Sequence, residues 1–114
     1  MSISSTIRLF PEPLRSLGFA SIGAGYMGIG TALDNPSRIL HIQNLTDATL
    51  LFSFNGVDDH EVLPANAFLL IDVTTNRTTD SGLYFAAGTR IYVKQSGVPT
   101  SGSVYVANFY GLTA

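Results

Sequence analysis

The spacing of apolar residues from residue 37 onward is the feature that most restricts how this chain can fold. Between residues 48 and 54, the side chains of Leu50, Phe52 and Phe54 fall on one side of an extended chain. Strands repeat every two residues and helices every 3.6, so this alternation indicates a strand. Asn55-Gly56 follows at once and is the strongest short signal for a hairpin turn. Similar stretches recur between polar turns, and none supports a helix longer than two turns.

Such a pattern is typical of a β-sandwich or barrel, and we predict an all-β fold, an antiparallel β-sandwich. The expected strands span residues 37–44, 48–54, 60–63, 67–73, 83–86, 89–94 and 103–109. In the first of these, alternation places either Leu40 and Ile42 or Ile39 and His41 inward, and the sequence does not decide between them. The expected core residues are Phe52, Leu70, Ile91, Val93, Val104 and Val106.

The first part of the chain has a different character, with prolines, many glycines and scattered apolar residues. We expect residues 1–17 to form an extended N-terminal arm and residues 18–114 to form a single sandwich domain. The side chains expected to bind a partner are those of Ile3, Ile7, Leu9, Phe10 and Leu14. The alternative is that this segment supplies the first strands of the sandwich. A truncated chain beginning at Gly18 separates the two, because the arm interpretation predicts that it folds but no longer binds its partner.

The composition argues against several classes of function. Charged residues make up only 12 % of the 114 residues and the net charge is −2, which gives no field to attract nucleic acid or anionic lipid. The few basic side chains are dispersed, and no apolar run approaches the length of a membrane helix. The chain has no cysteine, which excludes disulfides and thiolate chemistry. We therefore expect neither a nucleic-acid nor a membrane partner.

Two motifs resemble functional sites without meeting their requirements. Residues 23–28 match the glycine pattern of a dinucleotide-binding turn, but Gly30 and Pro36 leave no room for the helix that must follow. We expect these glycines to serve a bent or closely packed strand. Residues 58–61 bring together three carboxylates and His60, but alternate strand residues point to opposite faces, and a solvated hairpin end explains them better. No serine elbow is present. We expect no enzyme activity, no metal and no cofactor.

An ordered set of short phrases resembles a family of phage proteins, the capsid decoration or cement proteins of short-tailed bacteriophages. The set includes Asn44-Leu45-Thr46-Asp47 and Ser53-Phe54-Asn55-Gly56, and it spans residues 17–22, 26, 38–47, 53–56, 59–60, 63–65, 71–72, 88–94 and 101–106. The resemblance implies a β-sandwich, often a jelly roll, that sits on the outer capsid surface of the virion and bridges subunits of the major capsid protein. It implies a protein made in the host cytoplasm that associates with copies of itself as a dimer or trimer, and it carries no catalytic residues.

Two other functions share the expected fold. A head-to-tail junction, collar or tail-fibre adaptor protein would also be a sandwich without chemistry, and its assembly into a ring would distinguish it. A carbohydrate-binding sandwich is the more remote alternative, because the chain contains no tryptophan for an aromatic platform.

Overall fold

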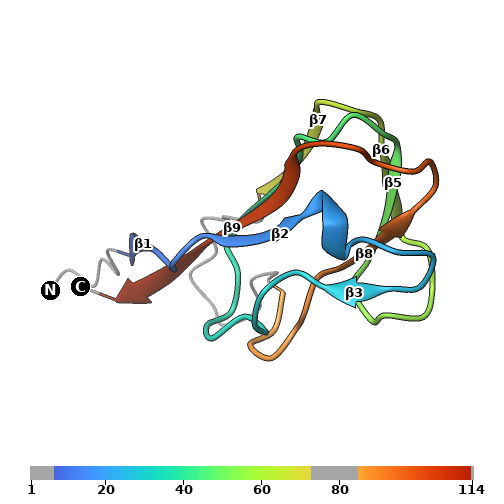
Figure 1. Cartoon of the computed structure of the whole chain (residues 1–114). Coiled ribbons are helices and arrows are strands. Elements are labelled where there is room, and N and C mark those ends of the chain that lie inside the picture. Colours follow the sequence, from blue (N-terminus) through green and yellow to red (C-terminus); the bar gives the residue numbers. More distant parts are fainter. Residues whose placement is uncertain (1–6, 73–84, 114) are drawn as a thin grey trace, which may run out of the picture.

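The fold consists of two antiparallel sheets (Figure 1). The computed structural model describes residues 7–72 and 85–113. Sheet A has the order β1-β9-β4-β7, with β2 also paired to β9, and its strands are β1 (Ile7–Pro11), β2 (Arg15–Gly18), β4 (Ile39–Asn44), β7 (Ala67–Asp72) and β9 (Ser103–Thr113). Sheet B has the order β3-β8-β5-β6, and its strands are β3 (Met27–Gly28), β5 (Leu50–Ser53), β6 (Glu61–Leu63) and β8 (Tyr92–Gln95).

The prediction of an all-β fold with antiparallel sheets is confirmed. Within the described ranges the only helical element is a single 3-10 turn, η1 (Phe19–Ser21). Six of the expected strands correspond to β4 through β9, with ends that differ by a few residues. The expected strand at residues 83–86 lies partly outside the described residues. Within its described part, Phe85 forms an isolated bridge with Ser37. Alternation did not reveal β1, β2 or β3, because prolines and glycines interrupt it.

The core lies between the two sheets and contains side chains from both. β4 alternates between half-buried and buried positions, and Leu40 and Ile42 are completely buried. The structure thus decides between the two alternatives that the sequence left for this strand. Five of the expected core residues are buried as predicted: Phe52, Ile91, Val93, Val104 and Val106.

The prediction that Leu70 belongs to the core is wrong, since its side chain is 54 % exposed. β7 carries apolar residues on both faces, so its sequence does not reveal which face is inner. The register with β4 decides: Leu70 lies opposite His41, whereas Leu69 lies opposite the buried Ile42. Residues directly opposite each other in an antiparallel pair share a face, and Leu70 therefore points outward with Phe68.

The hairpin predicted at Asn55-Gly56 is present, since β5 and β6 pair antiparallel, but its connection is longer than a two-residue turn. β5 ends at Ser53 and β6 begins only at Glu61, so a longer loop joins them. The Asn55 Oδ1 accepts hydrogen bonds from the backbone N–H groups of Val57 and Asp58, at 2.8 and 2.9 Å, and Gly56 has a positive φ of 78°. Side-chain capping of these backbone donors stabilises the longer connection between the two strands.

In the glycine motif at residues 23–28, Gly28 packs closely, as expected, whereas a Cβ at Gly23 or Gly25 would meet nothing within 4 Å, and no helix follows. Gly28 lies in β3, and no helix forms between there and Pro36. A Cβ atom at Gly28 would lie 2.2 Å from the Arg90 guanidinium carbon. Close approach of another side chain explains this glycine, as expected for a packed strand.

β9 extends beyond the sandwich and carries β1 with it. β4 pairs with β9 only as far as Phe109, whereas β1 pairs with β9 from Phe109 to Thr113. The two strands therefore form a two-stranded projection, which lies at the left of Figure 1. We call this part, residues 7–11 and 109–113, the ribbon.

Candidate docking surface

The outer face of sheet A is formed by β4, β7 and β9. Strand register places Phe68, Gln43 and Tyr105 in one row, and Leu70, His41 and Ala107 in the next. The Phe68 side chain is 64 % exposed and its ring meets the His41 ring edge-on, with 5.4 Å between the ring centroids. Gln43 Nε2 lies 3.2 Å from His41 Nδ1. These contacts hold an aromatic and amide surface in a defined arrangement without covering it.

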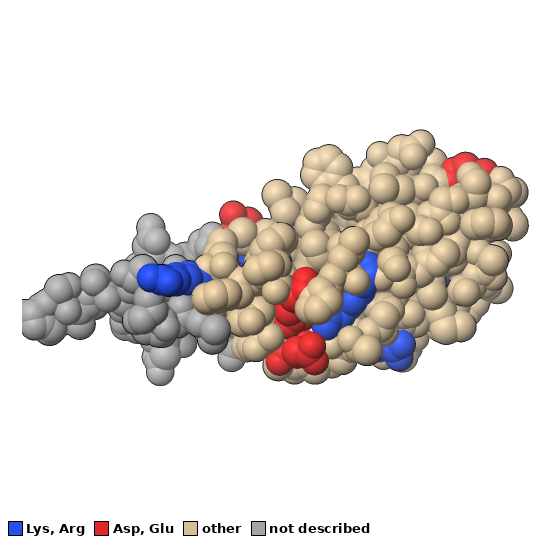
Figure 2. Space-filling view, turned by 60° about the vertical axis from the view of Figure 1, so that its left-hand side comes forward, with Lys and Arg blue, Asp and Glu red and all other residues tan. Residues whose placement is uncertain are grey.

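This outer face carries little charge. Among the outward positions of the three strands, only Asp72 is charged. The side of the molecule in Figure 2 is likewise mostly uncharged, with its acidic and basic side chains gathered mainly in one central group. Depletion of charge together with enrichment of aromatic residues is typical of the buried centre of protein interfaces. The outer face of sheet A has the composition of a docking surface.

The ribbon exposes further apolar side chains. Leu9 is 46 % exposed, Phe10 is 36 % exposed, and the Phe10 ring stacks on Tyr110 with 5.9 Å between centroids. Leu14, in the link between β1 and β2, is 62 % exposed. Three of the five residues predicted to bind a partner thus present apolar surface to solvent. Ile7 pairs through its backbone with Thr113, and Ile3 lies outside the described residues.

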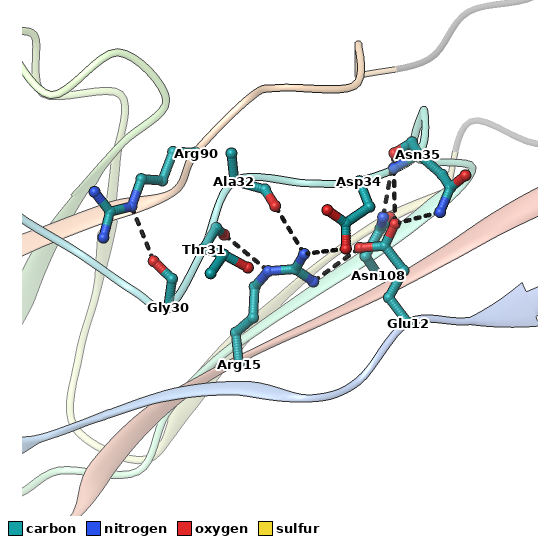
Figure 3. Close-up of polar contacts among 9 residues, drawn as sticks. All are labelled: Glu12, Arg15, Gly30, Thr31, Ala32, Asp34, Asn35, Arg90 and Asn108. Atoms are coloured by element: carbon teal, nitrogen blue, oxygen red, sulfur yellow. Dashed lines mark hydrogen bonds and ion pairs between the residues drawn. The ribbon is translucent and has the colours of Figure 1, made fainter.

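A buried ion pair anchors the root of the ribbon to the sandwich (Figure 3). Arg15 Nη1 lies 2.8 Å from Glu12 Oε1, and the two side chains are only 6 % and 2 % exposed. Arg15 also donates hydrogen bonds of 2.8 Å to the carbonyl oxygens of Thr31 and Ala32. Glu12 Oε2 accepts two 2.8 Å hydrogen bonds from Asn35. We call Glu12, Arg15 and Asn35 the clasp.

The clasp leaves Glu12 ionised. Burial acts to raise the pKa of Glu12, but hydrogen bonds from Asn108, Asn35 and Arg15 act to lower it, as does the Arg15 charge. The net pKa lies below its usual value. A charged pair of this kind requires good geometry on both sides to offset the cost of removing it from water. Glu12 Oε2 and Arg15 Nε and Nη2 are hydrogen-bonded, whereas Glu12 Oε1 and Arg15 Nη1 are buried with only their ion pair to each other. The hydrogen bonds to residues 31, 32 and 35 fix β1 and β2 relative to the loop at residues 30–35.

The clasp belongs to the segment that the sequence assigned to an arm. The expected arm, residues 1–17, contains β1 and most of β2, and β2 pairs with β9 from Ser103 to Val106. Gly30 lies directly against Arg15, since a Cβ at Gly30 would come within 2.9 Å of Arg15 Cβ. The φ of Gly30 is +63°, which also favours glycine at this position. For β2 these contacts match the alternative in which the segment supplies strands to the sandwich. β1, by contrast, pairs with β9 beyond the sandwich, from Phe109 to Thr113.

The acidic stretch at residues 58–61 lies at the end of the hairpin, as expected, with residues 58–60 in the loop and Glu61 at the start of β6. Asp58, Asp59 and His60 are exposed. The Tyr26 hydroxyl donates a hydrogen bond to Asp59, and Lys94 Nζ lies 3.1 Å from Asp59 Oδ1. These two contacts lower the pKa of Asp59. Across residues 7–72 and 85–113, no three His, Cys, Asp or Glu side chains converge in a way that could hold a metal ion.

The chain matches no known protein family, and neither the curated proteins nor the solved structures include a match.

Within the part of the chain that the structure describes, no helix has the length and apolarity needed to cross a membrane.

Sequence reasoning missed the outer face of sheet A as a candidate surface. Phe68 and Leu70 alternate with Leu69 and Ile71 in the sequence, and this pattern predicts that Leu70 lies in the core rather than on the outer face. The neutral outward positions of β4 and β9, at His41, Gln43 and Tyr105, gave a usable signal. Strand residues on a solvated face are normally polar or charged, and these are amide or aromatic.

Proposed function

We propose that this protein is a bacteriophage virion structural protein, a capsid decoration protein that binds the outer capsid surface and stabilises the shell by bridging major capsid subunits. The single observation that carries the proposal is the weakly charged outer face of sheet A, with Phe68 and Leu70 exposed. The family resemblance in the sequence supplies the identity of the partner.

The exposed side chains offer enough apolar area to matter. Phe68 is 64 % exposed, so covering its exposed part would remove roughly 130 Å² from water, taking about 200 Å² for a whole phenylalanine side chain. At about 25 cal/mol per Å² this amounts to about 3 kcal/mol before the costs of association. Many copies on one shell would then act together, since each attached copy stabilises the same lattice.

We propose that the ribbon acts as the arm of this protein and that the sandwich is of jelly-roll type. Leu9, Phe10 and Leu14 would lie against a capsid subunit next to the one that the outer face of sheet A contacts. Such an arrangement would allow one molecule to bridge two subunits, because the ribbon projects away from the sandwich (Figure 1).

The first experiment measures copy number in purified virions of the phage that encodes this protein. Quantitative mass spectrometry against the major capsid protein distinguishes the possibilities. A decoration protein is present in numbers comparable to the capsid protein, whereas a junction or collar protein is present only in the number of one ring. Absence from intact heads would contradict the proposal.

The second experiment tests the surface directly. Shells assembled without this protein are mixed with purified wild-type or variant protein and sedimented. Phe68→Asp and Leu70→Asp should each reduce co-sedimentation at least tenfold, because they place a charge in an apolar contact. Val98→Asp is the matched control, since Val98 is 72 % exposed in a loop and its change should leave binding unaltered. Equal binding by all three variants would show that this face does not meet the shell.

A further inference from the structure

A small cavity lies beside the clasp, where the link between β1 and β2 and the start of β2 face the loop at residues 30–35. Its volume is about 270 Å³, and the residues that line it are Pro13, Leu14, Arg15, Ser16, Gly30, Thr31 and Asp34. Pockets for drug-sized ligands usually measure about 300 to 1,000 Å³. This cavity therefore suits a single side chain better than a whole small molecule.

The charged groups at the cavity sum to one negative charge. Glu12 and Arg15 form an ion pair at 2.8 Å and offset each other, which leaves the Asp34 carboxylate in excess. Asp34 Oδ2 lies 3.7 Å from Arg15 Nη2, and the Asp34 side chain is 75 % exposed. This carboxylate accepts no hydrogen bond from the residues that the structure describes. It is free to bind a further cation from outside.

The Arg15 guanidinium cannot bind an anion at the same place. Its Nε and Nη2 groups already donate to the carbonyl oxygens of Thr31 and Ala32, and Nη1 faces Glu12. The side chain is also only 6 % exposed. With its donors used and its charge offset, Arg15 leaves the cavity selective for cations.

Arg90 is the next cation along the chain of contacts, and it is held elsewhere. Its Nε donates to the Gly30 carbonyl at 2.9 Å, but its guanidinium lies against Gly28 and 5.7 Å from the centre of the Tyr92 ring. Figure 3 shows it at the Gly30 end of the loop, pointing away from Asp34. Arg90 therefore does not occupy the place of an incoming cation.

The rest of the lining matches the two parts of a long basic side chain. Leu14 is 62 % exposed and offers apolar surface together with Pro13, against which an aliphatic stem can pack. Ser16 and Thr31 are exposed, and their hydroxyls form no hydrogen bond with the described residues, so they can accept from the charged end beside Asp34. Hydrogen bonds between charged groups are stronger than neutral ones.

We infer that this cavity binds the side chain of a lysine or arginine on the capsid subunit that Leu14 contacts. The identity of the partner rests on the proposed function, whereas the cavity and the class of its ligand do not. The cavity adjoins the ribbon, so a basic side chain seated there would fix the ribbon on its partner. A polar anchor of this kind gives orientation to a contact that is otherwise apolar.

The first test needs no shell. Ethylguanidinium chloride, which resembles the end of an arginine side chain, is titrated into the wild-type protein and followed by two-dimensional NMR, with sodium chloride at equal ionic strength as the blank. The amide signals of Ser16, Gly30 and Thr31 should shift and saturate. N-ethylurea has nearly the same shape without the charge and should give no saturable shift. The absence of saturation with ethylguanidinium, or equal shifts with N-ethylurea, would overturn the inference.

Two variants locate the ligand. Asp34→Asn should weaken ethylguanidinium binding about tenfold or more, because it removes the charged acceptor. Asp34→Glu keeps the charge and should retain binding. Asp58→Asn is the matched control, since Asp58 is an exposed acid in the distant β5–β6 loop, and it should bind as the wild type does. Equal binding by Asp34→Asn and wild type would place the cation elsewhere and refute the site.

The second test uses the shell. Asp34→Asn should reduce co-sedimentation with shells that lack this protein, and its binding should depend less on salt concentration than wild-type binding does, because one ion pair is missing. Unchanged shell binding by Asp34→Asn would refute the assignment of the occupant to a capsid side chain. Failure of the wild-type protein to bind shells would contradict the proposed function, whereas the ethylguanidinium titration would still decide whether the cavity binds cations.

Discussion

The clasp makes a quantitative prediction about stability. Arg15→Met keeps a side chain of similar length but removes the cation that faces the buried Glu12 carboxylate at 2.8 Å. The change also removes two hydrogen bonds to the backbone carbonyls of Thr31 and Ala32. Breaking one side of a buried pair typically costs about 3 to 5 kcal/mol, because it leaves an uncompensated charge in the interior. We expect a loss of this size in the free energy of unfolding.

The size of the loss follows from the environment of both groups. Arg15 is 6 % exposed, so solvent does not screen the pair as it would at the surface. Glu12→Gln should also destabilise, because it leaves the buried Arg15 with only the exposed Asp34 carboxylate, 3.7 Å from Nη2, as a counter-charge, while keeping an acceptor for Asn35. The double variant should lose less than the sum of the single variants, with a coupling free energy of about 1 to 3 kcal/mol.

The assay is urea unfolding followed by circular dichroism, at one protein concentration so that any self-association contributes equally to every sample. Arg8→Met is the matched control, because Arg8 is exposed on β1, and it should change stability by less than about 0.5 kcal/mol. A loss below about 1 kcal/mol for Arg15→Met, or strict additivity in the double variant, would refute the interpretation that the clasp holds the ribbon to the sandwich.

Three further predictions test the core, the turns and the pH dependence. The pKa of Glu12 is lower in the folded than in the unfolded chain, so the Glu12 carboxylate stabilises the fold fully above its unfolded pKa. This stabilisation is lost as the pH falls through the folded pKa. The difference in unfolding free energy between wild type and Glu12→Gln should therefore be constant above about pH 5 and shrink in acid. Phe52→Ala should lower the free energy of unfolding by about 3 to 5 kcal/mol, because Phe52 is completely buried. Leu70→Ala should lower it by less than about 1 kcal/mol, because Leu70 is exposed. Equal losses in urea unfolding would contradict the assignment of faces. Gly102→Ala should lower the melting temperature, since φ is +89° and a Cβ would lie 2.0 Å from the Leu45 carbonyl oxygen, while Gly25→Ala should not, because nothing lies within 4 Å of its Cβ position.

The truncation experiment now separates two parts of the N-terminal segment. Removing residues 1–11 deletes β1 but keeps the clasp and β2, so cooperative unfolding should be retained. Removing residues 1–17 also deletes Arg15 and most of β2, and the chain that begins at Gly18 tests whether the sandwich needs them. Wild-type stability of that shorter chain would support the expected boundary between arm and domain, and loss of cooperative melting would place β2 within the sandwich.

The fold class and most of the core follow from local sequence patterns. Two-residue alternation reflects a local property of the extended backbone, so it predicted the strands that became β4 through β9 and the burial of Phe52, Val93 and Val104. Likewise, the lack of a helix after the glycine motif follows from local chemistry, because Gly30 and Pro36 both disfavour a helix of the length that a dinucleotide-binding unit needs.

Only the tertiary structure decided which face of β7 is inner and how the first strands are held. Leu69 and Leu70 are equally apolar, and pairing with β4 alone turns one toward the core and the other toward solvent. Arg15 read as one dispersed cation among six basic residues, yet β2 brings it beside Glu12 and the carbonyls of a loop sixteen residues away. Such contacts depend on strand register and on partners distant in the chain. Alternation, turn propensity and composition carry no information about either, because each is a property of neighbouring residues.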